Sequence, residues 1–175
     1  MGRRPVRRWP GGTRVVLSRL FVALFPPQAV VRSLRAVLPA GAALTHPSKW
    51  HVTLVFLGEA PTDEVSSVLS GVAPRGNFSL RLSGGGRFGT AAWAGVTGDL
   101  EALASLQEGL RTLLSDSGFP SETRPYQPHL TVSYRGDGAM RRALAGYASS
   151  PWTVTEFALV ESKDGDYLPV RSWPV

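Results

Sequence analysis

Two segments of this chain carry the same pattern of residues that can do chemistry. His51-Val-Thr-Leu-Val-Phe56 lies in the first half of the 175 residues and His129-Leu-Thr-Val-Ser-Tyr134 in the second. Both follow the pattern His-apolar-Thr-apolar-x-aromatic. Alternate residues of a β-strand point to the same face, so each histidine shares a face with the threonine two positions later, Thr53 or Thr131. We expect the apolar residues between them to enter the core and the two polar faces to line a cleft between two lobes.

Two imidazoles and two hydroxyls in one cleft suit in-line displacement at phosphorus. Such a reaction needs a base beside the nucleophile and an acid beside the leaving oxygen. Histidine, with an unperturbed pKa of about 6.5, serves in either role near neutral pH. Threonine hydroxyls can donate hydrogen bonds to non-bridging phosphate oxygens, whose negative charge must be stabilised in the transition state.

A structural role is the alternative for each histidine taken alone, because a strand histidine is commonly a hydrogen-bonded part of the core. Two matched copies among only three histidines favour function. The third, His46, has no matched copy, and we expect it in a surface loop. The segment Gly84-Gly-Gly-Arg-Phe-Gly89 fits a dinucleotide-binding glycine pattern, but a predicted strand follows it instead of a helix. We therefore expect a flexible hairpin turn there.

The composition is typical of one folded domain and excludes several classes of site. The chain is 43% hydrophobic and 18% charged and contains no Cys, which excludes a disulfide framework and thiolate metal chemistry. A three-histidine metal site would need every histidine, so we expect neither a metal nor a cofactor. No apolar stretch approaches the roughly 20 residues that span a membrane. Arg19 interrupts the apolar run that an export signal needs, and we predict a cytoplasmic protein.

The net charge of +6 is concentrated at the amino terminus. Six arginines and no acidic residue occur in residues 1–19; the thirteen remaining basic residues equal the thirteen acidic ones. We interpret residues 1–13 as a flexible Arg-rich arm and residues 14–175 as a single domain. The arm is either a solvated tail, which its composition favours, or a contact for RNA.

The apolar spacing predicts an α+β fold with irregularly interleaved strands and helices. Short apolar or alternating runs predict strands over 19–25, 51–57, 78–82, 92–96, 130–134, 152–160 and 167–170. Helical spacing predicts helices over 30–38, 62–69, 100–114 and 139–147, with Thr62 and Asp99 as N-caps.

The paired motif and its surroundings resemble the 2H phosphoesterases, in particular the RNA 2′,3′-cyclic phosphodiesterases of the LigT-like type, historically called 2′-5′ RNA ligases. The resemblance covers about residues 19–174. It is carried by Arg19-Leu-Phe-Val-Ala-Leu, Trp50-His-Val-Thr-Leu-Val-Phe-Leu-Gly58, Pro128-His-Leu-Thr-Val, and Leu159-Val-Glu-Ser162 followed by Tyr167. It implies a bilobal fold, with two pseudo-twofold-related lobes of antiparallel sheet plus helices around a central cleft.

The resemblance also implies an activity, the metal-independent opening of a 2′,3′-cyclic phosphate on RNA ends or small cyclic nucleotides to a 2′-phosphate. By position, His51 and His129 would be the acid/base pair and Thr53 and Thr131 the phosphate binders. We assign His129 to the attacking water and His51 to the departing 3′ oxygen. A nucleotide-binding or RNA-end-binding module without turnover and a 2′-5′ RNA ligase are the alternatives, and we expect a monomer.

One position departs from the family pattern. The second motif of the family usually continues to an arginine where this chain has Tyr134, with Arg135 next. Either Arg135 reaches in from the strand end, or phosphate binding is weaker, or the substrate differs; Tyr134 is alternatively a simple packing residue. Tyr126 and Trp50 flank the motifs and are candidates for stacking on a base, with core or rim packing as the alternative.

Overall fold

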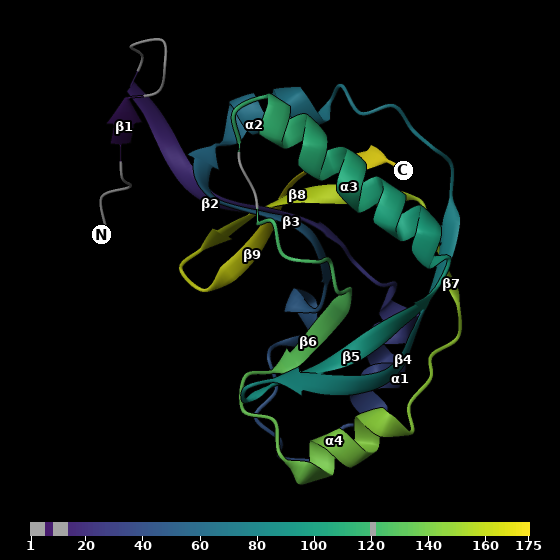
Figure 1. Cartoon of the computed structure of the whole chain (residues 1–175). Coiled ribbons are helices and arrows are strands. Elements are labelled where there is room, and N and C mark those ends of the chain that lie inside the picture. Colours follow the sequence, from purple (N-terminus) through teal and green to yellow (C-terminus); the bar gives the residue numbers. More distant parts are fainter. Residues whose placement is uncertain (1–5, 9–13, 120–121) are drawn as a thin grey trace.

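The structure is a computed structural model that describes residues 6–8, 14–119 and 122–175 (Figure 1). Its strands form an antiparallel arrangement in the order β7-β4-β5-β6-β3-β2-β8-β9, with β1 paired to β2. The strands are β1 (Val6–Arg8), β2 (Arg14–Leu24), β3 (Val52–Pro61), β4 (Phe78–Phe88), β5 (Ala91–Gly98), β6 (His129–Ser133), β7 (Trp152–Val154), β8 (Glu156–Lys163) and β9 (Asp166–Pro174).

The sheet consists of two four-stranded halves that meet at the strands of the two histidine motifs. One half has the order β9-β8-β2-β3 and the other β6-β5-β4-β7, and β3 meets β6 at the antiparallel pair Val52 and Leu130. The sheet curls so that the halves lie one above the other in Figure 1. This arrangement confirms the predicted α+β, bilobal fold and brings the two motifs together at its centre.

Four α-helices cover the sheet: α1 (Gln28–Val37), α2 (Thr62–Leu69), α3 (Leu100–Asp116) and α4 (Gly138–Ala145). Helix α3 packs against α2 and β3, and α4 packs against β4 and β5 (Figure 1). The hydroxyl of Tyr147, just after α4, hydrogen-bonds Ser33 of α1 at 3.3 Å. Apolar side chains from both halves join one large core cluster. None of the described helices is long and apolar enough to cross a membrane.

Several element boundaries differ from those expected from the sequence. The predicted strand 152–160 is two strands, because the chain passes at Thr155 from β4, the partner of β7, to β2, the partner of β8. Thr62 is the first helical residue, and Pro61 occupies the N-cap position. Asp99 is the N-cap of α3 by position, but its carboxylate accepts a hydrogen bond from the backbone N–H of Ser79 and caps nothing.

The hairpin that we expected at the glycine-rich segment is present, but its turn is confined to Gly89 and Thr90 and the rest of the segment is strand. Strand β4 continues through Gly84–Gly86 to Phe88 and stays paired with β5 after a register shift between Leu82 and Gly85. The ring of Trp93 on β5 lies over Gly86, where a Cβ atom would be only 2.5 Å from it. Glycine is therefore used here for close packing against a ring.

The interpretation of residues 1–13 as a loose arm falls largely outside the described residues. Residues 1–5 and 9–13 are not described, whereas Val6–Arg8 pairs in an antiparallel ladder with residues 14–16 of β2. For those three residues, backbone pairing replaces the loose conformation that we expected. Strand β2 accordingly begins at Arg14, ahead of the predicted Arg19.

Candidate active site

All four motif residues line one cavity of about 380 Å³ at the joint between the two halves. The strand pattern places them there: Val52, Leu54, Leu130 and Val132 are buried in the core, while the residues that alternate with them are half-buried. The remaining wall comes from three other parts of the chain: Phe21 of β2, the segment before β3, and the β8–β9 hairpin. The lining residues are Phe21, Thr45, His46, Lys49, His51, Thr53, Phe56, His129, Thr131, Tyr134, Gly165 and Tyr167.

The two imidazoles are held in the same way. The Nδ1 atom of His51 lies 2.6 Å from the carbonyl oxygen of Lys49, and Nδ1 of His129 lies 2.8 Å from that of Gln127. Each carbonyl belongs to the residue two positions before its histidine and can only accept, so each Nδ1 carries a proton. In both neutral rings the unprotonated nitrogen is therefore Nε2, which makes Nε2 the atom available for proton transfer.

Aromatic side chains surround His51. The ring of Phe21 on β2 lies 4.8 Å from it, Phe25 5.9 Å, and Tyr167 on β9 5.3 Å in an edge-on arrangement. Burial in this apolar surrounding lowers the pKa of His51. The Lys49 carbonyl acts in the opposite direction, and the nearby His129 lowers the pKa further. The low pKa makes His51 the neutral imidazole at pH 7.

The ring of His129 has aromatic neighbours from the other half of the sheet. Phe88 lies edge-on at 5.0 Å and Trp93 tilted at 5.9 Å, both between ring centroids. Trp93 is on β5, the strand next to β6, as Phe21 is on β2, the strand next to β3. Each catalytic candidate is therefore packed by an aromatic residue of the adjacent strand in its own half.

The threonines differ in their contacts. The hydroxyl of Thr53 lies 3.0 Å from Nε2 of His51. Thr131 lines the cavity from β6, and its backbone carbonyl lies 3.5 Å from the hydroxyl of Thr45. Both hydroxyl-bearing residues thus line the cavity into which the imidazoles project, the arrangement that the motif spacing predicts.

The other predicted site residues are dispersed. Tyr134 lines the cavity with its side chain 62% exposed, whereas Arg135 is exposed and is not part of the wall. Tyr126 lines an adjoining cavity of about 580 Å³ that shares Thr53 and His129 with the first. Its hydroxyl donates to the carbonyl of Thr53 at 3.0 Å, and burial raises its pKa well above the usual range.

Trp50 cannot stack on a base, which corrects the expectation drawn from its place beside the motif. Its side chain is 1% exposed, and its indole N–H donates to the hydroxyl of Thr45 at 2.9 Å. The same hydroxyl donates to the carbonyl of Val132 at 3.1 Å. Trp50 therefore acts inside the core, where it fixes the segment before β3 against β6.

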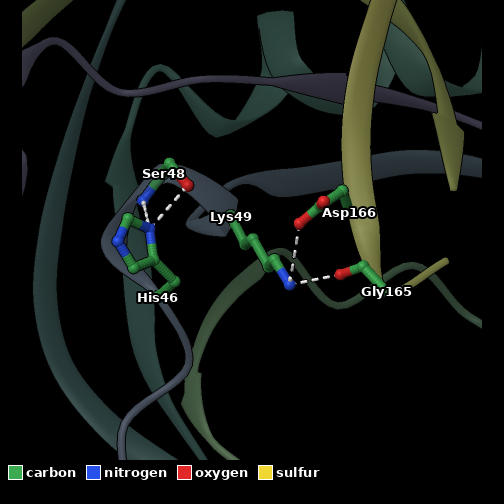
Figure 2. Close-up of polar contacts among 5 residues, drawn as sticks. All are labelled: His46, Ser48, Lys49, Gly165 and Asp166. Atoms are coloured by element: carbon green, nitrogen blue, oxygen red, sulfur yellow. Dashed lines mark hydrogen bonds and ion pairs between the residues drawn. The ribbon is translucent and has the colours of Figure 1, made fainter. Parts of the chain in front are cut away.

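Sequence reasoning missed the residues that reach the cavity from outside the motifs. Lys49 and Thr45 precede the first motif, and Gly165 and Tyr167 belong to the β8–β9 hairpin. His46 is exposed in a surface loop, as expected, and it also lines the cavity. Its Nδ1 atom accepts a hydrogen bond from the backbone N–H of Ser48 at 3.3 Å (Figure 2). Phe21 and Tyr167 alone gave a signal, as parts of the stretches that carry the family resemblance.

Among the described residues, no group of three or more His, Cys, Asp or Glu is placed to hold a metal ion. The polar groups that line the cavity are instead imidazoles, hydroxyls and one ammonium. These groups can exchange protons with a substrate and hold an anion.

The fold is that of solved phosphoesterase structures. Escherichia coli LigT in its apo form superposes with a TM-score of 0.75 at 25% identity, over 90% of this chain and 97% of that one. Protein TT0787 of Thermus thermophilus superposes with a TM-score of 0.71 at 26% identity, over 89% of this chain and 97% of that one.

The sequence comparison is more specific. The family model of the 2′-5′ RNA ligase superfamily matches residues 24–166, and the chain belongs to this superfamily. The RNA 2′,3′-cyclic phosphodiesterase of Thermus thermophilus is 33% identical over 164 residues, which cover 83% of this chain and 82% of that protein. The Escherichia coli enzyme of the same name is 30% identical over 131 residues, 70% of this chain and 74% of that one. These findings confirm the resemblance seen in the sequence.

Proposed function

We propose that this chain hydrolyses the 2′,3′-cyclic phosphate of RNA ends or nucleotides to a 2′-phosphate, with His51 and His129 as its acid/base pair. The observation that carries the proposal is that one cavity holds two histidines with the same tautomer, each fixed through Nδ1 by a backbone carbonyl. The names of the relatives from Thermus thermophilus and Escherichia coli support the same reaction.

The reaction needs one proton removed and one delivered. Nε2 of His129 accepts a proton from water, and the water oxygen forms a bond to phosphorus. The bond from phosphorus to the 3′ oxygen breaks, and the Nε2 proton of His51 goes to that oxygen. The product carries a 2′-phosphate and a free 3′ hydroxyl, and proton exchange with solvent restores both rings.

This assignment requires the substrate to protonate His51. Burial lowers the pKa of the ring before the substrate binds. A bound phosphate brings a negative charge into the same space, which favours the imidazolium. The substrate thus creates the acid that its own leaving oxygen needs.

Protonation of His51 also changes what Thr53 can do. When His51 is neutral, the Thr53 hydroxyl donates to the unprotonated Nε2, 3.0 Å away. Once Nε2 carries a proton it can no longer accept a hydrogen bond, and the hydroxyl hydrogen of Thr53 is released for a phosphate oxygen. The general acid and one phosphate donor therefore become competent together.

The test is hydrolysis of cytidine 2′,3′-cyclic monophosphate with and without EDTA, with the product isomer identified by ³¹P NMR. We expect cytidine 2′-monophosphate at equal rates in both. Saturable binding without product would indicate a binding module, and joining of oligonucleotide ends without hydrolysis would indicate a ligase. Activity that is lost with chelator and restored by a divalent ion would overturn the metal-independent mechanism.

A further inference from the structure

The proposed phosphate site lacks the positive charge that an arginine of the second motif usually supplies in this family. Tyr134 stands at that position and brings a neutral hydroxyl, while Arg135 lies outside the cavity wall. A phosphodiester is an anion, and its reaction places further charge on the non-bridging oxygens. Hydroxyl groups alone hold such an anion weakly compared with a charged donor.

Lys49 is the one lysine or arginine among the described residues that line the cavity. Figure 2 shows its side chain extended toward the tip of the β8–β9 hairpin, where the ammonium donates to the carbonyl of Gly165. The carboxylate of Asp166 lies 3.6 Å away, and the ring centroid of Tyr167 5.8 Å away. The ammonium is therefore held beside the ring that packs edge-on against His51.

The present partners of the ammonium leave it able to bind an anion. Asp166 is 75% exposed, and a pair so open to water is a weak one. The hydrogen bond to Gly165 uses one of three ammonium donors. The Asp164-Gly165 turn that presents this carbonyl has positive φ at both residues, 53° and 86°, a two-residue hairpin turn whose geometry fixes the carbonyl.

We propose that Lys49 binds the substrate phosphate and supplies the charge that Tyr134 does not. The inference rests on the proposed function and names one further residue of the same site. Because the carbonyl of Lys49 also holds Nδ1 of His51, one residue fixes the ring with its backbone and the phosphate with its side chain. The same ammonium ties the hairpin tip, and with it Tyr167, to the segment before β3.

The chain offers an internal comparison, because Lys49 and Lys163 are its only lysines. Lysine labelled with ¹³C at Cε gives two resonances, which the Lys49→Gln variant assigns. Titration with cytidine 2′-monophosphate should shift the Lys49 resonance, and the fitted Kd should equal the Kd from calorimetry. The resonance of Lys163, which is exposed, should not shift. Equal shifts of both would indicate a general charge effect and overturn the assignment.

Equilibrium binding of cytidine 2′-monophosphate then measures the contribution. Lys49→Gln should raise Kd about 10- to 100-fold, since it removes a charged donor to phosphate. Lys49→Arg should restore most of the affinity, and Lys163→Gln, the same loss of charge, should leave it within about twofold. Circular dichroism verifies that each variant is folded.

Asp166→Asn separates phosphate binding from a role in the ion pair with Asp166. If Lys49 acted only through that ion pair, this variant would weaken binding as Lys49→Gln does. We expect unchanged or tighter binding, because a competing anion is removed. Unchanged Kd in Lys49→Gln, or parallel losses in both variants, would refute the inference. If the wild-type chain binds cytidine 2′-monophosphate but does not hydrolyse the cyclic nucleotide, the proposed enzymatic activity is refuted. Lys49 would then remain the phosphate ligand of a binding module.

Discussion

At the scale of single residues, the two histidines share a hydrogen-bonding scheme but have different surroundings. Both rings are oriented by a carbonyl two residues upstream, which fixes Nε2 as the reacting atom. His51 is packed by Phe21, Phe25 and Tyr167 and has a lowered pKa. Two rings that present the same nitrogen to one cavity suit a reaction that needs one acid and one base.

We expect His51→Ala and His129→Ala each to lower kcat by about 10²- to 10⁴-fold, the usual contribution of a general acid or base. The double variant should lose little more, because both groups act on one transition state. Steady-state rates with a 2′,3′-cyclic nucleotide measure this, and His46→Ala, at the same cavity, is the comparison that should retain turnover. A single variant with wild-type kcat would contradict the assignment.

The direction of the pKa shift of His51 can be predicted both for the free chain and for the chain with bound nucleotide. In the free chain NMR should give a pKa below 6.5, because burial disfavours the imidazolium. Cytidine 2′-monophosphate should raise that pKa, since its phosphate favours the charged ring. By linkage, a depressed pKa in the folded state contributes stability above about pH 6.5 that is lost as pH falls through the folded value. A pKa that falls on binding would rule out substrate-assisted protonation.

Residue spacing predicted the motif residues because strand alternation is a local rule. His51 and Thr53 lie on one face whatever the rest of the chain does. Lys49 escaped notice because it meets Tyr167 only through the β8–β9 hairpin, and nothing in the sequence around Lys49 specifies a partner so distant. Trp50 was misjudged for a related reason: it directly precedes His51 in extended backbone, so its side chain points away from the cavity and into the core.

At the scale of elements, β4 and β5 show how backbone shape positions the ring of His129, a proposed catalytic residue. The Trp93 ring that packs against His129 rests on Gly86 of the neighbouring strand. The sequence indicated a turn over the whole segment because a glycine-rich run of six residues predicts flexibility. Local propensity cannot predict that the Trp93 ring of the neighbouring strand packs on these glycines.

Gly86→Ala should therefore lower kcat about 10- to 100-fold, because a displaced Trp93 ring misplaces His129. The added Cβ would lie 2.5 Å from the Trp93 ring, which must move. Gly146→Ala is the matched control, since a Cβ there meets nothing within 4 Å. Rates and the ¹H chemical shifts of the His129 ring report the effect; unchanged shifts with a lower rate would point to another cause.

At the scale of the whole molecule, the two halves share one core and meet at the strands that carry the motifs. Val52 and Leu130, the paired residues at this joint, are both fully buried. Damage at the joint should therefore weaken both halves at once, and the chain should unfold as one unit.

Leu130→Ala should cost about 2–5 kcal/mol of unfolding free energy, as a leucine truncation in a tight core does. Leu168→Ala, the same change at a side chain that is 48% exposed, should cost less than about 0.5 kcal/mol. Urea unfolding followed by tryptophan fluorescence and by far-UV circular dichroism should give coincident curves. Two separate transitions would show that the halves are independent.

The carbonyl anchors of the two rings have a consequence for how the site can change over generations. In a triad, an aspartate side chain orients the histidine, and one base change in the gene can delete it. Here the orienting groups are main-chain oxygens of Lys49 and Gln127, which every substitution at those positions retains. A point mutation at Lys49 or Gln127 therefore leaves the Nδ1–H tautomer of each ring unchanged. The side chains at these two positions can then differ between proteins with different ligands.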